Sequence, residues 1–272
     1  MKLTAEFEGH TCAFDASAGV DIAIPLEFDA SQPNAFSLRR ASSEAVRAGD
    51  FVGSTADGGS VNCRDVHFNP HGNGTHTECV GHIVDEPVAV GEMLEDAFHP
   101  ATLLTVRVRP AGRDNESYVP ELDEDDRVIT RAALNAAMAG LGTPPAFTSA
   151  LVVRTSPNEE SKKTRDYSGD NPPFLTRQAM EWVVEQEVDH LLVDVPSVDR
   201  EDDAGRTTNH HTFWEVEQGA NTLGGETPSH RTITEMVYLP DELSDGAYLL
   251  SIDLPRFQLD AAPSRPRLYP VE

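Results

Sequence analysis

The fold class is predicted by three segments in the middle of the chain: Ala150–Thr155 (ALVVRT), Arg177–Val184 (RQAMEWVV) and His190–Val195 (HLLVDV). The first and third segments are rich in aliphatic residues and bounded by polar or turn-forming residues, a pattern typical of buried strands. The second follows Thr176, a favourable N-cap residue, and places its apolar side chains on one helical stripe. A strand, a helix and a second strand in this order indicate a crossover unit of an α/β fold.

Further elements are predicted on both sides of this unit. A helix is expected over 131–138, after Thr130 as N-cap and before Gly140 and Gly142 as stop signals. The C-terminal third contains strand-like runs with no helix between them, which favours a mixed sheet. The additional predicted strands are Val20–Phe28, Leu103–Arg109, Ile233–Leu239 and Ala247–Leu254. We therefore expect one α/β domain over residues 1–272. The long loop Pro157–Pro173 is either a lid over a site or a surface excursion.

Composition excludes several classes of partner. The 272 residues include 46 acidic and 21 basic side chains, a formal charge of −25. A polyanion requires cationic cover, so neither a nucleic acid nor an anionic membrane is an expected partner. No apolar run approaches the roughly 20 residues of a membrane-spanning helix, and the first residues lack a secretory signal. Three widely spaced cysteines argue against a disulfide framework and are typical of a reducing cytoplasm, where we expect the protein.

Histidines gather in one short stretch of the sequence. Four of the ten lie within the sixteen residues His67–His82. If this stretch is extended, His76, Glu78 and His82 point to the same face, because side chains alternate along a strand. Two imidazoles and a carboxylate on one face are suitable ligands for Zn²⁺, Mn²⁺ or Fe²⁺. The pattern therefore predicts a divalent metal site.

A second group of polar residues lies far downstream, over Ser197–Asp203, Asn209–Trp214 and Thr232–Tyr238. Glu235 is an acid within an apolar, strand-like run. If its carboxylate is buried it must be paired, protonated or bound to a metal, whereas on a half-exposed strand it would simply face solvent. The acidic run 201–203 is expected to be a solvated turn.

The string His71–His82 resembles the metal motif of the cyclase family, which includes bacterial kynurenine formamidase (arylformamidase). The family pattern is His-x-Gly-Thr-His-x-Asp-x-Pro-x-His, and Gly74-Thr75-His76 and His82 match it. Three positions depart from the pattern, which has His at Gly72, Asp at Glu78 and Pro at Val80. The resemblance extends from about Val20 to Asp245 through Val152–Thr155, Val193–Asp199, His210–Trp214 and the pair Thr234-Glu235.

The resemblance implies a swivelling β/β/α fold and one or two divalent ions, with Zn²⁺ the first expectation and Mn²⁺ the second. It assigns the first ion to His76 and Glu78, with His71 as the nearest substitute for the family's first histidine. It assigns the second ion to Glu78, His210 and Glu235, so that Glu78 bridges the two ions. His82 matches the family's general acid/base, which acts with a metal-activated water on a carbonyl group.

The activity implied by the resemblance is hydrolysis of a small-molecule amide outside peptide bonds, as in the arylformamidase step of tryptophan catabolism, by a homodimer or homotetramer. A cyclic amide or lactone hydrolase, or a cyclase, on the same metal site is the alternative. A thiol enzyme with Cys79 as nucleophile is disfavoured, because Cys79 has the opposite strand parity to His76 and Glu78. An acidic metal-binding protein remains the alternative without catalysis.

Overall fold

A mixed sheet of nine strands is the centre of the computed structural model, which describes residues 1–112, 115–225 and 227–272. In spatial order its strands are β17 (Ala261–Pro263), β8 (His76–Cys79), β15 (Thr232–Glu235), β14 (His190–Val193), β12 (Ala150–Ser156), β9 (His99–Arg107), β16 (Gly246–Asp253), β18 (Arg265–Pro270) and β3 (Val20–Asp21). The central strands β15, β14, β12 and β9 run parallel. Their outer neighbours β8 and β16 are antiparallel to them, which confirms the predicted mixed sheet.

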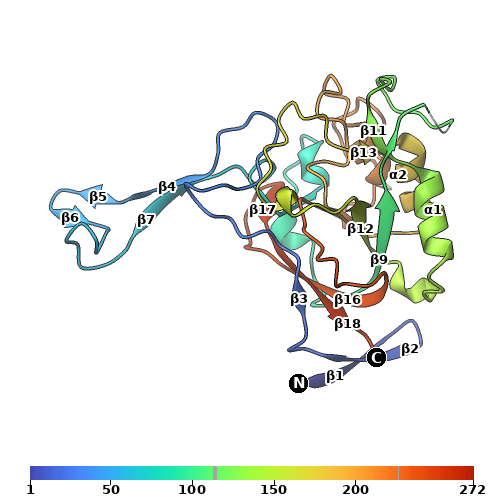
Figure 1. Cartoon of the computed structure of the whole chain (residues 1–272), viewed down its shortest axis with the longest axis horizontal. Helices are drawn as coiled ribbons and strands as arrows, with labels where there is room; N and C mark the ends of the chain where they lie inside the picture. The colour runs from blue at the N-terminus through green and yellow to red at the C-terminus, as the bar shows by residue number, and fades with distance from the viewer. Residues whose placement is uncertain (113–114, 226) are drawn as a thin grey trace.

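Two capped helices cover one face of the sheet. They are α1 (Arg131–Ala139) and α2 (Arg177–Glu185), which lie close together at the same side of the molecule (Figure 1). The hydroxyl groups of Thr130 and Thr176 accept hydrogen bonds from the first-turn amides, as an N-cap residue does. Both predicted helix starts are therefore confirmed. A third, short helix, α3 (Thr208–Phe213), packs against α2.

Strand β12 shows how the core is divided. Leu151 and Val153 pack in the cluster between the sheet and the helices, while Ala150 and Val152 pack in a second cluster on the opposite face. Side chains of a strand alternate between its two faces, so a continuous apolar run is expected where both faces are buried. This explains why residues 150–153 and 191–193 are all apolar.

The remaining strands lie outside the central sheet. A hairpin of β1 (Lys2–Phe7) and β2 (His10–Asp15) carries the N-terminus, and β10 (Arg109–Pro110), β11 (Arg127–Ile129) and β13 (Phe174–Leu175) form a small sheet. A two-stranded arm protrudes from the body, built from β4 (Ser42–Ala45), β5 (Arg47–Ala48), β6 (Phe51–Val52) and β7 (Arg64–His67) (Figure 1). Short 3₁₀ helices occupy Val80–His82, Val90–Glu92, Pro145–Phe147 and Glu160–Lys163.

The predicted strand Val20–Phe28 is wrong beyond its first two residues. Only Val20 and Asp21 form β3, because the chain then leaves the sheet edge. The amide of Ile24 donates to the hydroxyl of Thr75 rather than to a neighbouring strand, and Pro25 has no amide hydrogen to donate. Apolar character alone therefore indicated burial here but not strand pairing.

The loop 157–173 is fastened to the body of the protein. Lys162 is buried in it and donates to the carboxylate of Asp194 at 2.7 Å and to the hydroxyl of Thr155 at 2.9 Å. A surface excursion with no internal anchor would not bury a lysine, since a charged group leaves water only when it is paired.

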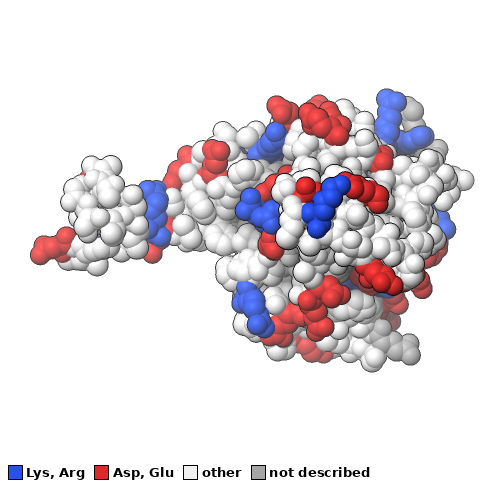
Figure 2. Space-filling view, turned by 90° about the horizontal axis from the view of Figure 1, so that it is seen from below, with Lys and Arg blue, Asp and Glu red and all other residues white. Residues whose placement is uncertain are grey.

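Acidic side chains are spread over the face shown in Figure 2, with fewer basic side chains among them. This agrees with a solvated, self-repelling surface. Among the described residues, no helix is both long and apolar enough to cross a bilayer.

Buried His190 gives the fold a pH dependence. Burial lowers the pKa of His190 from 6.5 to about 3, and the nearby His99 and His230 add to this effect. The unfolded chain protonates this imidazole near its ordinary pKa, so its stabilising contribution is present above pH 6.5 and is lost as the pH falls towards 3. We predict that His190→Gln flattens the decline of the unfolding free energy in urea titrations across this range. His10→Gln, at an exposed position, should leave the decline unchanged. Equal slopes for His190→Gln and the wild type would contradict the prediction.

Candidate metal centre

Three of the predicted ligands lie on one face of two adjacent strands. In the antiparallel pair β8 and β15, His76 is opposite Glu235 and Glu78 is opposite Ile233. Because side chains alternate, His76, Glu78 and Glu235 project from the same face. Their side chains are 0%, 1% and 3% exposed. Glu235 is therefore buried, and the alternative that it faces solvent is wrong.

The ring of His76 is held in one orientation. Its Nδ1 donates to the carbonyl of Gly74 at 3.0 Å, which leaves the lone pair on Nε2. Gly74 has a φ of +116°, a conformation in which residues with side chains are strained, and this turn brings its carbonyl back to the ring. Nε2 lies 3.5 Å from a carboxylate oxygen of Glu235 and has no hydrogen-bond partner. A buried lone pair without a partner is unusual in proteins and is typical of a metal ligand.

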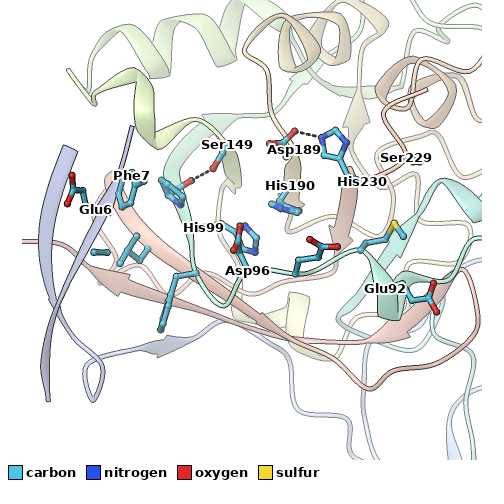
Figure 3. A pocket seen from close by; sticks show the side chains of 16 residues that line it. Glu6, Phe7, Glu92, Asp96, His99, Ser149, Asp189, His190, Ser229 and His230 are labelled. Atoms are coloured by element: carbon cyan, nitrogen blue, oxygen red, sulfur yellow. Dashed lines mark hydrogen bonds and ion pairs between the residues drawn. The ribbon is translucent and has the colours of Figure 1, made fainter. Parts of the chain in front are cut away.

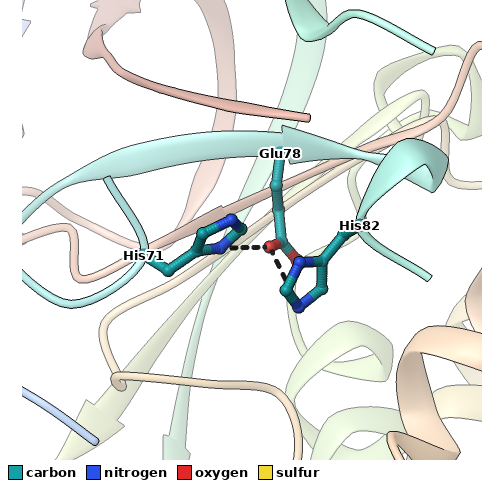
Figure 4. Close-up of side chains that lie close together, drawn as sticks. All are labelled: His71, Glu78 and His82. Atoms are coloured by element: carbon teal, nitrogen blue, oxygen red, sulfur yellow. Dashed lines mark ion pairs between the residues drawn. The ribbon is translucent and has the colours of Figure 1, made fainter. Parts of the chain in front are cut away.

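Glu78 lies at the centre of the site. Its Oε1 accepts from Nε2 of His210 at 2.8 Å. Its Oε2 is 3.1 Å from Nδ1 of His71 and 4.0 Å from Nε2 of His82, yet it accepts no well-aligned hydrogen bond (Figure 4). Burial alone would raise the pKa of Glu78, but the charges of His82 and His210 hold it well below its ordinary value. The carboxylate is therefore ionised, and one of its two oxygens has no hydrogen-bond partner.

His82 reaches this cluster by a route that the sequence did not predict. Strand β8 ends at Cys79, and the chain turns through the 3₁₀ helix Val80–His82. Gly81 makes this turn possible, because a Cβ atom there would lie 2.4 Å from the carbonyl oxygen of Val88. The shared parity of His76, Glu78 and His82 thus predicted the correct neighbours although the stretch is not extended throughout.

His71, rather than a residue at position 72, brings an imidazole to this cluster. A Cβ atom on Gly72 would lie 2.5 Å from Cδ1 of Leu38 and 3.2 Å from the carbonyl oxygen of Ala35, so a side chain at position 72 would require Leu38 to move. The ring of His71 instead contacts Glu78. Burial opposes its protonation, but the hydrogen bond to Asp260 and the nearby carboxylate of Glu78 raise the pKa of His71 to about 10.

Asp260 is a site residue that the sequence analysis missed. Its Oδ2 is 2.9 Å from Nε2 of His71 and 3.2 Å from Nδ1 of His82, so one carboxylate oxygen joins both rings. These hydrogen bonds lower the pKa of Asp260. It lies in the loop between β16 and β17, 178 residues after His82. The sequence around it contains no recognisable signal, because only the packing of β17 beside β8 brings it here.

Asp199 was also missed, although it ends a segment that carried the family resemblance. Its Oδ2 lies 2.5 Å from Nδ1 of His210, which leaves Nε2 of that ring facing Glu78. Its Oδ1 accepts from the hydroxyl of Tyr118 at 2.7 Å. Carboxylates that orient a histidine in this way are common behind metal ligands. Asp203 is buried and accepts from the same hydroxyl at 3.1 Å, so the prediction of a solvated turn over 201–203 is wrong for this residue.

The donor atoms fit a divalent cation. Two triads each offer ligand atoms within 4.8 Å of one another, namely His71, Glu78 and His82, and His76, Glu78 and Glu235. Glu78 belongs to both triads, as a bridging carboxylate would. This grouping differs from the one that the resemblance implies. His82 belongs to a triad with His71, and His210 belongs to neither triad, although its Nε2 lies 4.0 Å from a carboxylate oxygen of Glu235. All six predicted site residues nevertheless come together at the carboxyl end of β15. Two of their buried ligand atoms, Nε2 of His76 and Oε2 of Glu78, have no hydrogen-bond partner, which suits a metal site.

Comparison with known proteins agrees with this geometry. Residues 2–200 match the model of a protein family described as "Putative cyclase". The chain belongs to this cyclase family. The predicted family membership is therefore confirmed. No curated protein matches the sequence.

Several solved structures share the cyclase fold of this chain. One is a potential metal-dependent hydrolase with cyclase activity, with a TM-score of 0.59 and 14% identity over 92% of this chain and 96% of that chain. Isatin hydrolase A from Labrenzia aggregata has a TM-score of 0.58 and 14% identity over 93% and 94% of the two chains. Isatin hydrolase A from Ralstonia solanacearum has a TM-score of 0.55 and 15% identity over 92% and 91%. These likenesses confirm the predicted fold.

Cys79 faces away from the cluster. Its Sγ is 3.5 Å from the carbonyl oxygen of Val88, and burial raises the pKa of its thiol to about 12. A thiol that is buried and protonated at neutral pH is a poor nucleophile. The structure therefore agrees with the parity argument against a thiol enzyme.

Glu78→Gln tests the metal centre. The amide keeps the shape of the side chain but removes the only charge that both triads share, so we predict loss of tightly bound transition metal, measured by elemental analysis after dialysis. Glu201→Gln is the matched control, because Glu201 lines the same cavity but belongs to neither triad. Equal metal content in Glu78→Gln and the control would contradict the assignment.

Proposed function

We propose that this member of the cyclase family is a divalent-metal-dependent hydrolase of small amides. The observation that supports it best is the buried, ionised carboxylate of Glu78 shared by two ligand triads at the wall of a cavity of about 330 Å³. This volume lies at the lower end of the range for small-molecule sites. Macromolecular substrates would require a more open groove.

The ion would be held by His76, Glu78 and Glu235, with His71 and His210 available to a second ion. Zn²⁺ is the first expectation and Mn²⁺ the second, because nitrogen and carboxylate ligands accept both. A bound ion of this kind supplies Lewis acidity, which lowers the pKa of a water molecule and polarises a carbonyl group.

His82 is suited to proton transfer beside such an ion. Asp260 accepts from its Nδ1, which fixes the ring and directs Nε2 towards Glu78 and the cavity. The side chain is 30% exposed, so a substrate can reach it, unlike the fully buried His76. We assign to His82 the delivery of a proton to the leaving nitrogen of the amide, a role that histidine often has in enzymes.

An N-formylated arylamine, as in arylformamidase, is the first substrate candidate. Phe36 and Leu38 line the cavity with apolar surface that an aromatic ring can contact. The second candidate is a cyclic amide, which the similarity to two isatin hydrolases favours because isatin is itself a lactam. Both substrates need the same attack on an amide carbonyl, so they differ in pocket shape rather than in chemistry.

A substrate panel with metal-replete protein tests the proposal. We predict one or two transition ions per chain and hydrolysis of N-formylkynurenine or isatin, followed by absorbance. His82→Asn should retain its metal but lose roughly 10²–10⁴-fold in kcat. Cys79→Ser is the control and should keep full turnover, because its thiol faces away from the cluster.

Two results would contradict the proposal. One is the absence of hydrolysis of any amide, lactam or lactone by fully metal-loaded protein. The other is the binding of many weakly held Ca²⁺ ions in place of one or two transition ions, which would favour an acidic metal-binding protein.

A further inference from the structure

The arm over residues 42–67 has no hydrophobic support of its own. It protrudes from the body, with β5 and β6 at its tip (Figure 1). None of its residues belongs to a hydrophobic cluster of the described chain. It nevertheless carries three of the six large hydrophobic side chains that are exposed among the described residues, namely Phe51, Val61 and Val66. An isolated two-stranded ribbon is only marginally stable in water, so the arm lacks a surface to pack against.

The N-terminal hairpin of β1 and β2 shows what such support looks like. Phe14 of this hairpin is buried in a cluster with Leu249 of β16. The ring of Phe7 packs edge-on against Phe147, with ring centroids 5.2 Å apart, and lines a cavity of about 690 Å³ beside the body (Figure 3). Phe51 of the arm is instead 40% exposed. The body therefore supports the N-terminal hairpin but not the arm.

The outer edge of β7 is open to another strand. Ser43 of β4 lies opposite Val66 of β7, and the amide of Ser43 points away from β7 to the carboxylate of Asp29 at 3.2 Å, so Asp29 covers the edge of β4. Hydrogen-bonded and non-bonded pairs alternate along an antiparallel ladder, so the N–H and C=O groups of Val66 point away from β4. The amide of Val46 donates to the carbonyl of Cys63 at 3.0 Å, as the same alternation requires. No strand of the described chain pairs with the outer edge of β7.

Charge selects the register in which β7 would pair with a second copy of itself. Two identical antiparallel strands pair around a two-fold axis, and this axis passes through a residue because the outward backbone groups of both strands must meet. An axis at Arg64 sets two arginines opposite each other, and an axis at Asp65 sets two carboxylates opposite each other, which is destabilising. An axis at His67 would rely on residues beyond the end of the strand. An axis at Val66 joins the two valines and sets Asp65 opposite His67 of the second copy.

We propose that the arm binds a second copy of this chain, with β7 pairing antiparallel to β7 of that copy around a two-fold axis at Val66. The pairing produces a four-stranded sheet in the order β4, β7, β7, β4, which has the strand number that a ribbon needs for stability in water. It directs the tip of each arm, with Phe51 and Val61, towards the base of the other arm. A stable dimer buries about 800 Å² per partner, which is more than four paired residues supply, so the tips contribute to the interface as well.

A second copy of the chain suits this surface for two reasons. A two-fold pairing covers both free edges at once, because each β7 is the partner of the other. Each chain also carries a formal charge of −25, so direct contact between two bodies is opposed by repulsion. The arm protrudes from the body, and a contact made through it keeps the bodies apart (Figure 2).

Val66→Pro tests the backbone pairing, by sedimentation of the full-length protein over a series of concentrations. We predict that the wild type is at least a dimer and that Val66→Pro raises its dissociation constant about tenfold or more, because each copy loses an N–H group that its own arm does not use. Phe51→Ser should weaken the assembly in the same direction, because apolar surface at the tip is lost. Leu259→Ser removes an exposed leucine outside the arm and should leave the assembly unchanged.

Charge variants at position 67 test the register. His67→Lys should tighten the assembly and His67→Asp should weaken it, because position 67 lies opposite Asp65 of the second copy. His10→Asp adds the same charge at an exposed position outside the arm and is the matched control. If Val66→Pro fails to fold, the opposite effects of the two His67 variants still decide the question.

Val66→Cys in a Cys63→Ser background locates the axis. Residues that exchange hydrogen bonds across an antiparallel pair have Cα atoms about 5.5 Å apart, which is within the range of a disulfide. Oxidation of Val66→Cys should therefore give a covalent dimer. Val61→Cys in the same background is the control, because two copies of this position lie about 33 Å apart along the paired strands and should not cross-link.

Three outcomes would overturn the proposal. They are a wild type that is monomeric at every concentration, an assembly that Val66→Pro and both His67 variants leave unchanged, and cross-linking of Val61→Cys as rapid as that of Val66→Cys. The second outcome would show that the copies meet at another surface. None of these measurements uses turnover, so they decide the question whether or not the proposed hydrolase activity is found.

Discussion

The arrangement of this protein around its candidate active site depends on one buried carboxylate. Glu78 is 1% exposed, lies in a strand enclosed by β15 and β17, and is ionised. A buried charge is strongly destabilising unless cationic or hydrogen-bonding groups surround it. Three imidazoles fulfil that requirement: His71 and His82 lie on either side of β8 along the chain, and His210 lies in α3.

The rest of the centre orients those imidazoles. Asp260 joins His71 and His82, while Asp199 holds His210. Each ring thereby directs a chosen nitrogen inwards, which prepares the donor set before any ion arrives. The same logic explains why the site lies where parallel and antiparallel strands of the sheet meet. At this point the end of β15, which carries Glu235, and the loop after β14 lie close to the antiparallel strand β8, which carries His76 and Glu78.

The sequence predicted the elements and ligands that depend on local patterns. The capped helices after Thr130 and Thr176 follow from short-range hydrogen bonding, and the shared face of His76 and Glu78 follows from strand alternation. The role of Asp260 could not be predicted, because it depends on a contact made 178 residues away along the chain. The burial of Glu235 was likewise undecidable from its strand alone, since an alternating pattern does not say whether other parts of the protein cover the face that carries it.

Metal binding at Glu78 is the central claim, and anomalous diffraction from crystals of metal-replete protein tests it most directly. The account predicts an anomalous peak at the absorption edge of the bound metal, about 2.0–2.2 Å from a carboxylate oxygen of Glu78 and from Nε2 of His76. An absence of any peak there, with the His71–Glu78 and Glu78–His210 contacts intact and the metal located elsewhere, would contradict it.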